Sequence, residues 1–188
     1  MTSPSADGLR WRAAGSGDAA GLLALKQELD RETSFMLLEP GERRETAEDV
    51  AATLGAMAGA GNSVVIVAET AGRLVGYAEA RGGRVRRNRI TARVVIGVLA
   101  AASGRGVGAG LLRELELWAP AHGIHRLELT VMARNHRAFG LYQRMGYATE
   151  GRRRECLLVD GRLTDELYMA KLLSTEGQAE HGTWRPGR

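Results

Sequence analysis

The stretch Ala102-Ser103-Gly104-Arg105-Gly106-Val107-Gly108-Ala109-Gly110-Leu111-Leu112 joins an apolar run, 94–99, to a segment with helical spacing of apolar residues, 111–118. A glycine-rich turn between a strand and a helix exposes backbone N–H groups at the positive end of the helix dipole, which favours a bound phosphate or pyrophosphate. Glycine permits positive φ and close approach of the ligand. The alternative is a chance glycine cluster. The predicted phosphate contacts are Gly104, Arg105, Gly106, Val107, Gly108 and Ala109; the Arg105 side chain either adds charge there or faces solvent.

A second segment, Asn135 to Tyr147, reads as a helix ended by Gly146 and followed by a strand. Together the two segments resemble the GNAT superfamily of acyl-CoA-dependent N-acetyltransferases. The family pattern N-x-x-A-x-x-x-Y-x-x-x-G-F/Y is matched at every defined position. The pattern R/Q-x-x-G-x-G/A is matched at Gly106 and Gly108, with Ser103 where Arg or Gln is usual. The resemblance covers residues 9–173, and we expect 1–8 and 174–188 to be disordered.

The order of expected elements, together with this resemblance, implies a single mixed α/β (α+β) domain. Its mixed, mostly antiparallel sheet would have about seven strands, with helices on both faces. Expected strands are 9–12, 63–69, 73–80, 90–98, 127–131, 147–158 and 163–172, and expected helices begin after Asp18, near Thr46, near Leu111 and at Asn135. An Ala71-Gly72 turn and an Asp160-Gly161 turn are predicted to close hairpins.

The resemblance implies an N-acetyltransferase that uses acetyl-CoA as co-substrate. An acetyl group would move to a primary amine, on a small molecule or a protein N-terminus, by direct attack through a tetrahedral intermediate. Pantetheine would lie beside the strand that ends at Val98. Asn135 and Tyr142 are seven residues apart, two helical turns, and would share a face beside that arm. Tyr142, with an ordinary pKa near 10, would donate a proton to the departing thiolate; the alternative is a core tyrosine.

The base that deprotonates the amine is not identified by any motif. Glu79, near a strand end, and Glu128, inside a strand, are the candidates, and for each a structural ion pair or an exposed carboxylate is the competing interpretation. Many family members carry a carboxylate on the strand before the glycine turn. The segment 91–96 has none, so a water-relayed base is a third possibility.

Composition narrows the partners and the compartment. The net charge is +4 and the pI about 9.7, but the arginine runs 84–89 and 152–154 are not interleaved with aromatic residues, and aromatic content is only 5%. We therefore expect solvated arginines and no specific nucleic-acid partner. One cysteine, Cys156, and no apolar run of membrane-spanning length point to a cytoplasmic protein without a membrane partner. Four histidines without a ligand pattern predict no metal, and a homodimer is possible.

Two other functions fit parts of the sequence. Gly104, Gly106 and Ala109 match G-x-G-x-x-A, so a dinucleotide-binding oxidoreductase is an alternative, although Ala100 to Ser103 separate the strand from the first glycine. A non-catalytic GNAT-like module that senses CoA is the other, and intact Asn135 and Tyr142 argue mildly against it. The acceptor amine itself is not specified by any motif.

Overall fold

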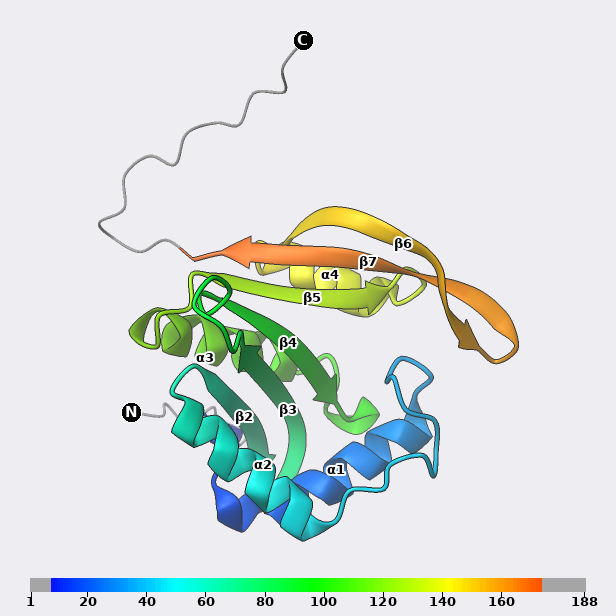
Figure 1. Cartoon of the computed structure of the whole chain (residues 1–188). Coiled ribbons are helices and arrows are strands. Elements are labelled where there is room, and N and C mark those ends of the chain that lie inside the picture. Colours follow the sequence, from blue (N-terminus) through cyan, green and yellow to red (C-terminus); the bar gives the residue numbers. More distant parts are fainter. Residues whose placement is uncertain (1–7, 174–188) are drawn as a thin grey trace.

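In the computed structural model, which describes residues 8–173, a seven-stranded sheet with strand order β1-β2-β3-β4-β5-β7-β6 forms the centre of the molecule (Figure 1). Of the strand pairs within residues 8–173, only β4–β5 is parallel. The strands are β1 (Arg10–Ala13), β2 (Ser63–Thr70), β3 (Arg73–Gly82), β4 (Thr91–Val98), β5 (Arg126–Met132), β6 (Ala148–Val159) and β7 (Arg162–Leu172). The helices are α1 (Ala19–Glu32), α2 (Ala47–Ala60), α3 (Val107–Ala121) and α4 (His136–Arg144), with short 3₁₀ turns η1 (Ser16–Asp18) and η2 (Ala100–Ala102).

Helices cover both faces of the sheet because alternate strand residues are apolar on both sides. On β2, Val65 and Val67 pack with α1 and α2, whereas Ile66 and Ala68 belong to a second cluster with α3. Figure 1 shows α1 and α2 in front of the sheet and α3 and α4 behind it. A period of two with both faces apolar is what a strand buried between two layers requires.

Local signals place most elements as predicted, although α3 begins at Val107 and not near Leu111. The Thr46 hydroxyl accepts a hydrogen bond from Asp49 N–H at 3.2 Å, and the Asp49 carboxylate accepts one from Thr46 N–H at 2.8 Å, which forms the expected capping box of α2. Gly146 follows α4 with φ +86°, as a residue just past a helix end does. The mixed α/β domain with helices on both faces is confirmed. The predicted disordered ends, Gly8 apart, lie outside the described residues.

The sheet opens between β4 and β5. Register pairs join the two strands only at Thr91–Arg126, Ala92–Leu127 and Arg93–Glu128. Beyond Arg93 the strands diverge, which Figure 1 shows clearly. From Val94 to Val98 the β5-facing edge of β4 therefore has no strand partner among residues 8–173. An unpaired strand edge presents N–H and C=O groups that an extended ligand can bind.

Candidate active site

The glycine turn connects the end of β4 to the start of α3. Gly104 and Gly106 have φ of +80° and +81°, a region that L side chains rarely adopt, and both residues are exposed. Gly106 is the N-cap of α3, and the first α-helical hydrogen bond runs from Gly110 N–H to Gly106 O at 2.9 Å. The N–H groups of Val107, Gly108 and Ala109 precede that bond and have no intrahelical acceptor. Such a helix start binds anions.

Two side chains from distant segments hold this turn. Trp11 on β1 donates a hydrogen bond from Nε1 to the Val107 carbonyl at 3.2 Å. A Cβ on Gly110 would lie 2.3–2.5 Å from three atoms of that indole, so glycine is required there for Trp11 to pack. Glu32, the last residue of α1, accepts a hydrogen bond from Ala100 N–H at 2.8 Å. The turn is therefore preorganised by contacts with β1 and α1.

Arg137, which sequence reasoning missed, lies beside the turn. It is an exposed residue in the first turn of α4, and its Nη2 would be 3.6 Å from a Cβ placed on Gly104. The structure gives Arg137 no ion-pair partner within residues 8–173. A cation at this place adds attraction for a phosphate to the attraction of the free amides. The available signal was an arginine two residues after Asn135, the N-cap of the helix.

Gly108 has a different role from Gly106. Its Cβ would lie 2.9 Å from Leu141 Cδ2 on α4 and 3.9 Å from Ile96 and Val98 side-chain atoms on β4. The absent side chain thus lets α3 approach α4 closely. The N–H of Gly108 is in the first turn of α3 and has no intrahelical acceptor, so it remains a potential anion contact.

Asn135 lies one residue before α4, not within it. Its Oδ1 accepts a hydrogen bond from Ala138 N–H at 3.1 Å, as an N-cap does. The side-chain oxygen is therefore used by the fold, and only the NH₂ group remains for a ligand. Asn135 therefore caps the N-terminal end of α4, and Tyr142 lies seven residues later, near the C-terminal end of the helix.

Tyr142 is 5% exposed, and its phenol has no hydrogen-bond partner among the described residues. Burial raises its pKa above the ordinary value of about 10 that the sequence analysis assumed. The neighbouring Tyr147 ring lies 5.8 Å away, centroid to centroid, and its buried hydroxyl has no hydrogen-bond partner in the described part of the chain. Burial, with smaller contributions from Glu116 and Tyr142, also raises the Tyr147 pKa. Both phenols therefore stay protonated at neutral pH.

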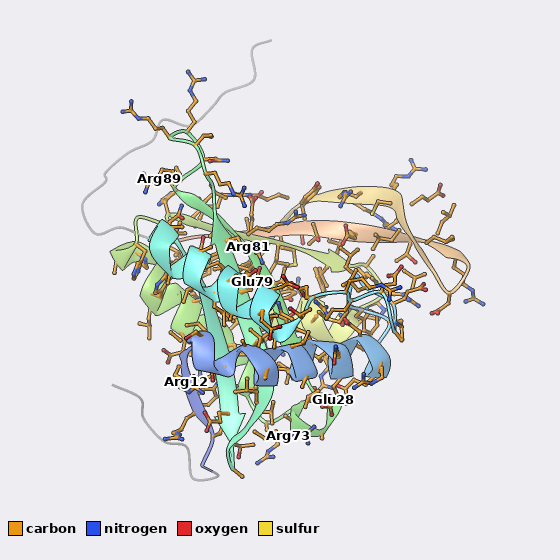
Figure 2. All side chains as sticks on the ribbon, turned by 60° about the horizontal axis from the view of Figure 1, so that its bottom comes forward. Arg12, Glu28, Arg73, Glu79, Arg81 and Arg89 are labelled. Atoms are coloured by element: carbon orange, nitrogen blue, oxygen red, sulfur yellow. The ribbon has the colours of Figure 1, made fainter. Side chains whose placement is uncertain are left out.

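Glu79 on β3 is buried under α1. Its carboxylate lies 3.6 Å from Lys26 Nζ and accepts a hydrogen bond from Arg81 Nε; both carboxylate and ammonium groups are about nine-tenths buried. Figure 2 shows Glu79 and Arg81 next to each other on the sheet beside α2. Glu79 thus contacts two cations, Lys26 and Arg81, which is the structural ion pair considered as the alternative to a base.

Glu128 lines a hollow of about 260 Å³ at the point where β4 and β5 separate. Its Oε2 accepts a hydrogen bond from Arg126 Nε at 2.9 Å, and its side chain is 41% exposed. The other lining residues are Arg93, Leu129, Thr130 and Tyr168. Of the two predicted carboxylates, Glu128 is the one that faces this open space.

A larger hollow, about 370 Å³, lies at the far end of the sheet near Arg73 and Glu28. Its charged side chains pair with one another: Arg12 with Asp18 and Glu69 at 2.7 and 3.0 Å, and Arg73 with Glu28 at 2.7 Å. Both arginines of this hollow are thus paired with carboxylates among the described residues, so neither is left to bind a phosphate. The β4–β5 opening, with its free amides and unpaired strand edge, is the stronger candidate.

Comparison with known proteins agrees with this geometry. A model of the acetyltransferase (GNAT) family matches residues 22–147. The chain belongs to the GNAT family. An acetyltransferase of this family from Streptococcus pneumoniae is 31% identical, with a TM-score of 0.84 over 87% of this chain and 99% of that one. A ribosomal-protein-alanine N-acetyltransferase from Brucella melitensis is 28% identical, with a TM-score of 0.77 over 87% and 99%.

A third structure, yncA from Salmonella typhimurium, a putative acetyltransferase with its cofactor acetyl-CoA, has the same fold. It is 22% identical, with a TM-score of 0.80 over 92% of this chain and 98% of that one. Among curated proteins none matches the sequence significantly. This GNAT protein is an acetyl-CoA-dependent acyltransferase. The dinucleotide-binding oxidoreductase alternative is therefore wrong: its glycine spacing arises from a GNAT turn.

The described residues add two observations. No helix within 8–173 is long and apolar enough to cross a bilayer. In the same part of the chain, no group of three or more His, Cys, Asp or Glu side chains is placed to hold a metal ion.

Proposed function

We propose that this GNAT protein transfers an acetyl group from acetyl-CoA to the primary amine of a small molecule at the β4–β5 opening. The observation that carries this proposal is the order of three features along β4. They are the hollow lined by Arg93, the unpaired edge from Val94 to Val98, and the free amides at the start of α3. An extended molecule with phosphates at one end and a thioester at the other matches that order.

In this proposal the chain binds the pyrophosphate through the amides of Val107, Gly108 and Ala109, with Arg137 as the charged contact. The backbone of β4 near Val98 binds the pantetheine arm as an added strand would, which requires no particular side chain there. The Asn135 NH₂ group donates to the same arm. Acetyl-CoA supplies an activated acyl group whose leaving group is a thiolate.

Two residues move protons. Glu128, which faces the hollow, accepts a proton from the incoming ammonium directly or through water, because only the neutral amine is a nucleophile. Deprotonating an alkylammonium of pKa about 10.4 at pH 7 costs roughly 4–5 kcal/mol, so a positioned acceptor accelerates the step. The amine attacks the thioester carbon, and Tyr142 donates to sulfur as the C–S bond breaks. The second proton, which the nitrogen loses as the amide forms, then restores the Tyr142 hydroxyl. The dry surroundings that raise the Tyr142 pKa also make thiolate formation without a donor unfavourable.

We further propose a cytoplasmic location, since Cys156 can form no internal disulfide. A homodimer and the lack of a specific nucleic-acid partner stay predictions.

An acceptor screen tests the proposal. The full chain is incubated with acetyl-CoA and pools of primary amines, and CoA thiol release is measured against acetyl-CoA alone. Release that depends on one pool, with the acetylated amine found by mass spectrometry, is the expected result. Binding of acetyl-CoA without release for any amine, small or peptidic, would instead indicate a CoA sensor.

A further inference from the structure

The hollow at the β4–β5 opening is lined by Arg93, whose guanidinium has no ion-pair partner among the described residues. Arg93 is exposed, lines the hollow, and lies directly opposite Arg81 in the β3–β4 pairing. Residues in direct register share a face of the sheet, and like charges placed so destabilise it. Arg81 donates to Glu79. Within residues 8–173 the structure gives the Arg93 side chain no hydrogen bond or ion pair.

The other arginines around the hollow are already neutralised. Arg126 donates to Glu128 at 2.9 Å and also pairs with Glu150. Arg153, whose guanidinium lies 5.7 Å from the Tyr168 ring centre, pairs with Glu166 at 2.6 Å. Arg93 is thus the one lining cation of the hollow that lacks a carboxylate among the described residues.

Resting on the proposed function, we propose that the acceptor is an α-amino acid, and that Arg93 binds its carboxylate. A guanidinium matches a carboxylate with two parallel hydrogen bonds, so it recognises charge and shape together. Arg93 and Glu128 are in register across the β4–β5 pair, so one molecule can meet both. The carboxylate then lies on Arg93 and the ammonium towards Glu128, the proton acceptor.

The charge of the hollow argues against other amines. Its volume of about 260 Å³ is enough for an amino acid. A polyamine would place its second ammonium near Arg93 and Arg81, and like charges disfavour that pose. An amino acid brings a carboxylate to Arg93, which has none among the described residues.

The experiment compares L-amino acids with their carboxamides, which keep the amine and the side chain but lack the anion. Pools of each are given to the full chain with acetyl-CoA, and kcat/KM is measured for the best acceptor of each pool. We expect the acid to exceed its amide by about tenfold or more, the scale of a charge-assisted hydrogen bond. The amine of the carboxamide is the less basic of the two, so a larger fraction of it is neutral and able to react at neutral pH. Intrinsic reactivity therefore favours the amide, and a preference for the acid must come from binding.

Variants assign the preference to Arg93. Arg93→Met should abolish it by lowering kcat/KM for the acid and not for the amide, and Arg93→Lys should restore part of it. Arg89→Met is the matched control, because Arg89 lies on the exposed loop before β4, away from Glu79 and Arg81 (Figure 2), and it should keep the full preference. Arg93→Met should not lower the melting temperature, since it removes a like-charge pair.

Equal turnover of acids and amides, or a preference that survives in Arg93→Met, overturns the assignment while the acetyltransferase stands. A lower melting temperature of Arg93→Met also overturns it, because Arg93 would then serve the fold. If no amine is acetylated, the proposed function fails. Calorimetry of the same acids on the CoA-loaded protein then tests Arg93 alone: binding by wild type and its loss in Arg93→Met are expected, and equal binding refutes the role.

Discussion

Replacing Tyr142 by phenylalanine separates a catalytic phenol from a core residue. The hydroxyl has no partner among the described residues and the ring is 5% exposed, so Tyr142→Phe removes no hydrogen bond of the fold and preserves the packing. The free energy of unfolding should change by less than about 1 kcal/mol, because the substitution removes no hydrogen bond of the fold. Loss of a proton donor in the transition state should lower kcat about 10²- to 10⁴-fold, or roughly 3–5 kcal/mol.

The assay is steady-state thiol release with the acceptor found in the screen, supported by a single-turnover measurement to show that chemistry is rate-limiting. Tyr147→Phe is the matched control: it is the same chemical change in a buried ring 5.8 Å away, and its kcat should stay within about threefold of wild type. Because burial raises the Tyr142 pKa, its ionisation should cause no loss of wild-type kcat between about pH 7 and 9. A Tyr142→Phe protein with near wild-type kcat would refute the role of the phenol.

Three further predictions concern the anion site and the fold. Arg137→Met should weaken acetyl-CoA binding about tenfold by calorimetry, whereas Arg144→Met, at the other end of α4, should not; equal affinities would remove Arg137 from the phosphate site. Gly106→Ala should cost roughly 1–2 kcal/mol in urea unfolding, because its φ is +81° and no atom lies within 4 Å of a new Cβ; an unchanged midpoint would refute the strain argument. Arg43→Met should cost about 3–5 kcal/mol by the same method, since it leaves the buried Asp30 carboxylate, bound by two hydrogen bonds of 2.7 and 3.0 Å, without its cation; a loss below about 1 kcal/mol would contradict this.

The sequence was most informative where local chemistry fixes the backbone. The capping box at Thr46, the hairpin glycine at Gly72 and the positive φ of Gly106 each follow from a short-range preference, and the structure has all three. The two family patterns then indicated that these elements form one domain of the GNAT type. Their joint spacing identifies the family more specifically than the glycine cluster or the helix pattern alone.

The parts that sequence could not supply depend on residues far apart in the chain. Arg137 reaches Gly104 only because α4 packs beside α3. From the sequence, Glu79 and Glu128 are equivalent candidate bases. In the structure Glu79 is buried against Lys26 of α1, whereas Glu128 lines the hollow where β4 and β5 diverge. No periodicity or motif encodes which carboxylate a helix covers.

A structure of the complex with acetyl-CoA would show the whole proposed site at once. We expect the pyrophosphate on the amides of Val107, Gly108 and Ala109 beside Arg137, the pantetheine along the free edge of β4, and the sulfur within hydrogen-bond reach of the Tyr142 hydroxyl. Cofactor bound instead at the hollow near Arg73, or along β4 with its sulfur directed away from Tyr142, would contradict the proposed site.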